Sequence, residues 1–346
     1  MEIQLDEKYI MAVMEALIET PSPVGYYEEC TPLLLKYLKD MHLTPYTDER
    51  HTVYALIEGE DTSRTVLVGA HMDTLGLQVH QILPDGTMTV RNLGGNNLSS
   101  LDGEKMFLKT LDGQTYTGFL VYKNHSVHVS RACKTGVRCE EDMRFLLDED
   151  VRSRGDVLAL GINTGDVLSA EPHFEYMENG RIRSRFIDNK GGVAALLGAM
   201  RYITEEKAVP KYNTLFAFPF YEELALGGTY TPDGVREYLA IDIGITGEEQ
   251  SVTEKDVAIL ARDKVAPYDR DLLRKLKAKA EKHGIAYAIE SFRFYTTDGM
   301  DAFVAGNNLK GAAFGMTVSG SHGIERTFDT SIFGTARLTV SYVCDL

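Results

Sequence analysis

The feature that most constrains the fold is a change of pattern along the chain. Helix and strand patterns alternate at both ends, whereas short strand patterns fill the middle. Alternation of this kind is typical of an α/β fold with a mostly parallel sheet and helices on both faces. We expect helices at 6–20, 33–43, 189–203, 268–284 and near the C-terminus, and strands at 53–57, 65–68, 214–218, 239–243, 257–260 and 312–317.

The middle of the chain is expected to form strands and turns. Leu77–Ile82 and Thr87–Val90 lie on either side of a Pro-Asp-Gly turn at 84–86, which predicts a β-hairpin. The same strand character continues in later apolar segments at 107–111, 116–121 and 157–160.

The length of the chain favours two domains, because a single compact core rarely serves 346 residues. We predict that residues 1–74 and 181–346 form one catalytic α/β domain. An inserted β-rich domain at 75–180 would interrupt it. With 44% hydrophobic and 25% charged residues, the composition is ordinary for a globular protein.

The net charge and the N-terminal sequence limit which classes of partner and which cellular location we expect. The formal net charge of -15 argues against a nucleic-acid partner, because phosphate binding requires clustered Lys and Arg. Neither a secretory signal nor a membrane-spanning run is visible, so we expect a cytoplasmic protein without a membrane partner. The cysteines are too few and scattered for a disulfide framework: Cys30, Cys133, Cys139 and Cys344.

Two candidate metal ligands lie where a strand ends or a helix begins. His71 follows the strand expected at 65–68, and Asp73 is suited to orient its imidazole. A buried histidine with ordinary hydrogen bonds is the alternative. Asp188 stands at a helix entrance before two glycines, which allow close backbone approach. A helix N-cap would also explain Asp188.

The most informative stretch is an apolar strand that runs directly into Glu222 and Glu223. A protein core avoids adjacent carboxylates, so we expect one to bind metal and the other to hold an attacking water as general base. A solvated turn is the alternative. Asp242 lies in an apolar segment, where a cation would compensate its burial. His322 lies in a loop of small residues and carries little information alone.

Together, His71, Asp188, Glu223, Asp242 and His322 supply two imidazoles and three carboxylates. Such donors suit zinc, cobalt or manganese better than copper or an iron–sulfur centre. One bridging carboxylate would suffice for two ions, about 3.5 to 4 Å apart as in two-metal hydrolases. We therefore predict two divalent metal ions per chain, with zinc or cobalt favoured.

In order, these motifs resemble the M42 metallo-aminopeptidases, the group of the glutamyl and tetrahedral aminopeptidases. The resemblance covers nearly the whole chain, and the ordered set is more specific than any of its members. It implies a zinc-peptidase-like α/β domain interrupted by a β-rich domain that helps to build dimers or dodecamers. The landmarks are the runs at 70–73, 161–166, 188–192, 222–223 and 241–242, and His322.

The resemblance also implies how the ligands are shared between two metals. His71 and Asp242 would serve one metal, and Glu223 and His322 the other. Asp188 would bridge the pair.

Further roles follow from the same resemblance. Glu222 would be the general base, and Asp73 would orient His71. A segment thought to contact the substrate corresponds loosely to residues that include Asp298 and Asp301, and the sequence does not decide between these two.

This chain departs from the family pattern around the substrate pocket. Tyr221 replaces a usual Gln, Leu224 and Ala225 replace Val-Gly, and the context of the last histidine has become Gly-Ser-His-Gly. Arg293 and Lys264 would favour an acidic N-terminal residue if they lay in the pocket, but surface positions are the simpler expectation.

The predicted function is removal of the N-terminal residue from short peptides with a free N-terminus. One alternative keeps the metals but makes the protein a deacylase or amidase of a small acylated amino acid. A glycoside hydrolase using Glu222 and Glu223 is less favoured, because adjacent residues rarely flank a sugar bond correctly. A non-catalytic scaffold or binding protein is the contrast from another class.

Overall fold

The computed structural model describes residues 3–346. The chain divides into two compact units, Met1–Asp73 with His173–Leu346 (unit 1) and Thr74–Pro172 (unit 2). The expected end of the insert at residue 180 falls later than the observed one. Residues 173–180 belong to unit 1, where β10 (Glu175–Tyr176) pairs with β11 (Arg181–Ser184). Such short strands resemble those of the insert, so the sequence does not separate them.

Unit 1 is built on a nine-stranded mixed sheet with the order β1-β2-β12-β3-β13-β17-β15-β16, in which β14 pairs with β17. The central neighbours β12, β3, β13 and β17 run parallel. Three pairings, β1 with β2, β2 with β12 and β15 with β17, are antiparallel. The predicted α/β fold with a mostly parallel sheet is confirmed. The strands of this sheet are β1 (Tyr46–Thr47), β2 (Val53–Ile57), β3 (Asp61–Gly69), β12 (Tyr212–Phe218), β13 (Val235–Ile241), β14 (Gly244–Ile245), β15 (Val257–Arg262), β16 (Tyr287–Ser291) and β17 (Lys310–Val318).

Both faces of this sheet are buried, which explains why its strands are almost continuously apolar. On β12, for example, Phe216 and Phe218 join one core, whereas Leu215 and Ala217 join the other. The first core holds residues of the long helices, and the second is covered by loops and a short helix. The helices of unit 1 are α1 (Glu7–Ile18), α2 (Cys30–Asp40), α5 (Ile187–Glu205), α6 (Arg270–Lys282), α7 (Asp298–Val304) and α8 (Asp329–Val343).

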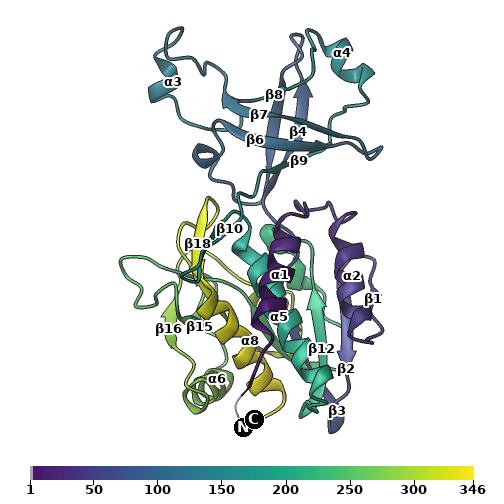
Figure 1. The fold of residues 1–346 in the computed structure, drawn as a ribbon, viewed down its shortest axis with the longest axis vertical. Helices are drawn as coiled ribbons and strands as arrows, with labels where there is room; N and C mark the ends of the chain where they lie inside the picture. Colours follow the sequence, from purple (N-terminus) through teal and green to yellow (C-terminus); the bar gives the residue numbers. More distant parts are fainter. Residues whose placement is uncertain (1–2) are drawn as a thin grey trace. The chain divides into compact units, whose positions relative to one another are not determined.

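Figure 1 shows α1, α5 and α8 side by side in unit 1. Small residues permit this packing: a Cβ atom at Gly198 of α5 would lie 2.4 Å from Cγ1 of Ile10 on α1. Unit 1 also contains a small separate sheet formed by β10, β11 and β18 (Glu325–Phe328). Across residues 3–346, none of the helices is both long enough and apolar enough to cross a lipid bilayer.

Unit 2 contains a closed barrel with the strand order β4-β5-β8-β7-β6-β9. The predicted hairpin is confirmed as the antiparallel pair β4 and β5. The strand character expected at 157–160 is wrong, because most of this segment lies in α4, where Ser153 caps the helix by accepting a hydrogen bond from the Asp156 amide. The elements are β4 (Gly76–Ile82), β5 (Met88–Leu93), β6 (Glu104–Lys109), β7 (Thr115–Tyr122), α3 (Ala132–Thr135), β8 (Met143–Leu147), α4 (Arg154–Ala159) and β9 (Val167–Ala170).

One close backbone approach in unit 1 has a direct bearing on the site described below. The amide of Asp242, just after β13, donates to the carbonyl of Phe314 on β17 at 3.1 Å. At the next residue of β17, a Cβ atom on Gly315 would lie 2.0 Å from the carbonyl oxygen of Asp242. Only glycine therefore allows the two strands to meet here.

We expect Gly315→Ala to lower the free energy of unfolding by about 3 kcal/mol, because the new methyl group meets backbone that cannot move aside. Gly155→Ala is the matched control. Gly155 lies within α4, and its Cβ atom would meet only Ser153 Oγ at 3.6 Å, so alanine should leave stability unchanged or raise it by about 1 kcal/mol. Denaturant unfolding of both variants measures this, and equal stabilities would contradict the proposed clash.

Candidate metal centre

Three adjacent parallel strands bring the predicted ligands to one edge of the sheet. His71 follows the end of β3, Asp242 follows β13 directly, and Glu222 and Glu223 lie in a 3-10 turn shortly after β12. Because β12, β3 and β13 are parallel neighbours, their carboxyl ends meet at the same edge. Residues far apart in the sequence thereby become close in space.

His71 is the centre of this group and is almost fully buried, with 1% of the residue exposed. Its Nδ1 lies 3.0 Å from the carbonyl oxygen of Asp73, so a proton on Nδ1 leaves Nε2 with a free lone pair. Nε2 lies 3.2 Å from Asp188 Oδ1 and 3.5 Å from Glu222 Oε2. Although these atoms are close, Nε2 has no partner with hydrogen-bond geometry. The alternative of an ordinary, fully bonded histidine is therefore not favoured.

Asp188 lies between the two candidate histidines. Its Oδ1 faces His71 Nε2 at 3.2 Å, and its Oδ2 faces His322 Nε2 at 3.7 Å. The backbone of Asp188 departs from helical geometry in the first turn of α5, whose N-cap residue is Phe186, and no side-chain cap hydrogen bond is formed at that position. The N-cap alternative for Asp188 is therefore not observed.

Asp73 fixes the turn that carries the paired glutamates. Its Oδ1 accepts the amide of Glu222 at 3.2 Å, and its Oδ2 accepts the amide of Glu223 at 3.1 Å. The glutamate side chains are 10% and 4% exposed, which is incompatible with a solvated turn. Burial raises the pKa of both glutamates well above the ordinary value, and neighbouring carboxylates add to this shift.

The other carboxylates of the cluster experience the same crowding. Burial raises the pKa of Asp242 to about 7, and the charge of Asp188 contributes in the same direction. Burial alone would lower the pKa of His71, but the surrounding carboxylates, with Glu222 the strongest, raise it well above its usual value. A cation at this position would relieve the repulsion, because a bound metal becomes the largest local charge.

Within this cluster, two triads have one ligand atom from each residue within 4.8 Å of one another. They are His71 with Asp188 and Glu223, and His71 with Glu222 and Asp242. Glu223 Oε1 and His71 Nε2 are both buried without a hydrogen-bond partner. Buried polar atoms are rarely left in this state, so imidazole and carboxylate donors with unused lone pairs fit a borderline divalent cation.

His322 reaches the cluster from the loop between β17 and β18. Ser319 and Arg326 close this loop through two backbone hydrogen bonds of 2.9 Å. The Ser319 hydroxyl also donates to Glu254 at 2.6 Å. The His322 side chain is 37% exposed, and its Nε2 lies 3.6 Å from Glu223 Oε2. This position gives His322 access to the side of Asp188 that faces away from His71.

The two aspartates of α7 have different surroundings. Burial raises the pKa of Asp298 well above its usual value, and the charges acting on it include those of His71 and Asp242. Burial raises the pKa of Asp301 to about 6, and there the nearby acid is Asp263. Charges of the cluster, His71 among them, act on Asp298, whereas Asp301 is influenced mainly by Asp263 and Lys264, although Asp301 in turn raises the pKa of Asp242.

Some supporting residues were missed by the sequence reasoning. Glu325 is 2% exposed, and its carboxylate accepts the amide of Asp188 at 3.0 Å. Asn189 donates from its side chain to the carbonyl oxygen of Ile241 at 2.7 Å, which joins α5 to the end of β13. A glutamate near a loop and an asparagine at a helix start carry no distinctive pattern, so only the tertiary structure identifies them.

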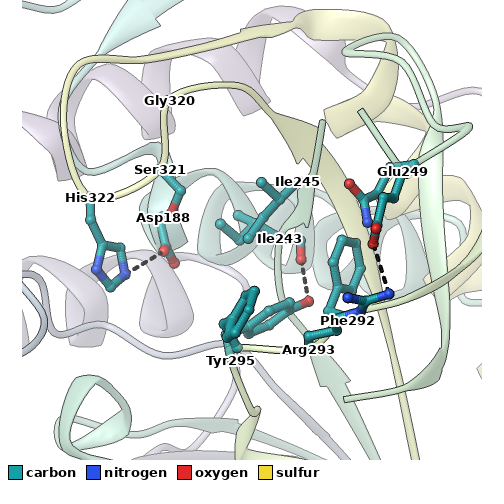
Figure 2. Close-up of a pocket in the computed structure, with 12 residues that line it drawn as sticks. Asp188, Ile243, Ile245, Glu249, Phe292, Arg293, Tyr295, Gly320, Ser321 and His322 are labelled. Carbon is teal, nitrogen blue, oxygen red and sulfur yellow. Dashed lines mark hydrogen bonds and ion pairs between the residues drawn. The ribbon is translucent and has the colours of Figure 1, made fainter. Parts of the chain in front are cut away.

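A pocket of about 560 Å³ adjoins the cluster, and two of the predicted ligands line it. Figure 2 shows His322 and Asp188 at one side of the pocket, with Arg293 and Glu249 at the other. Lys264 is not among the lining residues. The lining consists of Asp188, Ile243, Ile245, Glu249, Gln250, Phe292, Arg293, Phe294, Tyr295, Gly320, Ser321 and His322.

Known proteins resemble this chain in both sequence and fold. The M42 glutamyl aminopeptidase family matches residues 52–338. A Bacillus subtilis (strain 168) protein, YhfE, provisionally named an aminopeptidase, is 34% identical over 334 residues, which cover 96% of each chain.

Two solved structures have the same architecture. The TET aminopeptidase of a marine-sediment archaeon, Thaumarchaeota archaeon SCGC AB-539-E09, has a TM-score of 0.88 at 18% identity, covering 98% of this chain and 97% of its own. The TET1 peptidase of Pyrococcus horikoshii, which can assemble into a tetrahedron or a large octahedral shell, has a TM-score of 0.86 at 22% identity, covering 97% and 100%. The structural likeness supports the fold, and the sequence match identifies the family: this chain belongs to the M42 glutamyl aminopeptidases and is a hydrolase that acts on peptides.

Proposed function

We propose that the protein is a dinuclear-metal aminopeptidase that removes the N-terminal residue of short peptides. The observation that carries the proposal is the position of Asp188, whose two carboxylate oxygens face two different histidines. A carboxylate placed in this way is suited to bridge two cations. Asp242 would complete the site on the side of His71, and Glu223 would complete it on the side of His322.

When bound, a pair of divalent ions would polarise the scissile carbonyl and activate a water molecule. Glu222 is the proposed general base. Its carboxylate is buried beside His71, and its amide is fixed by Asp73. Because burial and the neighbouring acids raise its pKa, Glu222 is suited to accept a proton from the attacking water and to deliver it to the leaving amine.

Asp298 is the proposed contact for the free α-ammonium group of the substrate. It is 3% exposed, and its Oδ1 is buried without a hydrogen-bond partner. A buried, unpaired carboxylate beside a catalytic cluster offers a charge-assisted hydrogen bond to an ammonium group. The same group would disfavour N-acylated substrates, in which this positive charge is missing.

Homo-oligomer formation through unit 2 is also part of the proposal, because a structural relative assembles into large shells. Exposed apolar residues support it: Leu111, Val129 and Val137 are 82%, 86% and 75% exposed in unit 2. A contact between copies that removed these apolar side chains from water would be favourable.

Elemental analysis of the purified protein should find two divalent metal ions per chain. Chelation should abolish cleavage of amino-acid anilides, and zinc or cobalt should restore it, because the bound ions would polarise the carbonyl and activate the water. Full activity in excess chelator would contradict the metal mechanism. Faster cleavage of N-acetyl amino acids than of free-amine anilides would instead support a deacylase.

Glu222→Gln should lower kcat by at least about 100-fold while both metal ions remain bound, because the amide cannot accept the proton. The adjacent Glu223→Gln is the matched comparison, and it should reduce metal content because it removes a proposed ligand. Kinetics and elemental analysis of both variants measure the difference. A Glu222→Gln enzyme that kept most of its activity would show that another group is the base.

Asp298→Asn should raise KM for free-amine substrates by about tenfold, because a charged partner of the ammonium group is lost. Asp301→Asn, three residues away, should change KM by less than about twofold, since the charges that act on Asp301 are mainly those of Asp263 and Lys264. Steady-state kinetics with a leucine anilide distinguishes the two. A larger effect at Asp301 would reverse the assignment.

A further inference from the structure

The pocket beside the cluster is placed to receive one particular part of a peptide. Asp188 and His322 line both the pocket and the candidate metal centre, and Ile243 directly follows Asp242. A peptide with its first carbonyl group at the cluster therefore has the side chain of its N-terminal residue within reach of this pocket. Its volume of about 560 Å³ lies within the range of small-molecule sites.

The inner walls of the pocket are apolar. Ile243 is 2% exposed and Phe292 is 6% exposed, and Ile245 and Tyr295 add to the apolar lining, beside the uncharged polar side chains of Gln250 and Ser321. The Tyr295 hydroxyl donates to the carbonyl oxygen of Ile243 at 2.6 Å, so its polar end is already engaged. Figure 2 shows this hydrogen bond between the two residues. The walls thus offer an apolar surface and little that would compensate a buried charge.

One ion pair stands at the solvent side of the pocket. Arg293 Nη2 lies 3.2 Å from Glu249 Oε2, and the side chains are 71% and 64% exposed. Among the described residues that line the pocket, these two carry the charges that lie outside the metal cluster. Their opposite charges largely cancel, so the pocket presents neither a net positive nor a net negative partner to an incoming side chain.

We propose that this pocket selects uncharged apolar N-terminal residues, such as leucine or methionine, and that Glu249 and Arg293 determine this specificity by neutralising one another. This inference rests on the proposed aminopeptidase function and adds the substrate class to it. Arg293 lines the pocket, but its guanidinium group is paired with the Glu249 carboxylate. A preference for acidic residues is therefore masked in the native chain.

The first test compares kcat/KM for leucine, alanine, glutamate and lysine anilides with the metal-loaded native enzyme. Burial of the larger apolar side chain should favour leucine over alanine by about tenfold or more. Glutamate and lysine should both fall at least about tenfold below leucine, because their charges find no partner. Glutamate or lysine as the best substrate would overturn the proposed class.

The second test unmasks each charge separately. Glu249→Gln should raise the glutamate-to-leucine ratio of kcat/KM by about threefold to tenfold, and Arg293→Gln should raise the lysine-to-leucine ratio similarly. The double variant should return both ratios to near the native values. The shifts should shrink at high ionic strength, since both groups are exposed.

Glu281→Gln is the matched control for loss of an exposed, paired carboxylate. Glu281 lies on α6 and pairs with Lys277 at 2.6 Å, and neither residue lines the pocket. The control should leave all substrate ratios unchanged. The proposed role of the Glu249–Arg293 pair would be overturned if the single variants kept the native substrate ratios of kcat/KM. It would also be overturned if the Glu281→Gln control shifted these ratios equally.

Direct binding separates failure of this inference from failure of the proposed function. The tripeptides Leu-Gly-Gly and Glu-Gly-Gly are titrated calorimetrically into the Glu222→Gln protein, and the leucyl peptide should bind at least about tenfold more tightly. If no anilide is cleaved but this difference persists, the proposed aminopeptidase function is wrong and the pocket assignment is supported. Equal binding of the two peptides would overturn the pocket assignment even if the native enzyme is active.

Discussion

Mutual repulsion among buried carboxylates is the constraint on which the rest of this site depends. Asp188, Glu222, Glu223 and Asp242 lie together around His71, and their carboxylate side chains are largely buried. Burying one unpaired carboxylate is costly, and burying several side by side requires a compensating cation. The fold must therefore hold these groups in place by contacts other than their own mutual attraction.

Backbone contacts provide that support. Asp73 binds the amides of both glutamates, Glu325 binds the amide of Asp188, and Asn189 joins the start of α5 to the end of β13. Gly315 allows β17 to approach the backbone of Asp242. Each contact positions a backbone segment and leaves the side-chain oxygens directed toward the cluster. This division is typical of metal sites, in which outer residues orient the ligands.

The sequence suggested the residues at the centre of the candidate site more readily than those around it. His71, Asp242 and the paired glutamates were recognisable because each follows an apolar strand, and parallel strands bring such positions to one sheet edge. Glu325 and Tyr295 act through contacts that no local pattern encodes. The strand prediction for 157–160 was wrong for a related reason. Four consecutive apolar positions fit either a strand or a helix, and only the helix cap at Ser153 distinguishes the two.

Apart from Asp188 and His322, the cluster and the pocket are formed by different residues, and this has a consequence for how specificity arises. The candidate ligands lie mainly at strand ends, where a change of position would disturb the sheet. The apolar walls and the Glu249–Arg293 pair lie in the segments around 243–250 and 292–295. Of these residues, Glu249 and Arg293 are exposed, and exposed positions tolerate substitution more readily than the core does. The preferred N-terminal residue can therefore change while the reaction centre is kept. In this chain, the Glu249–Arg293 ion pair lies beside an apolar surface.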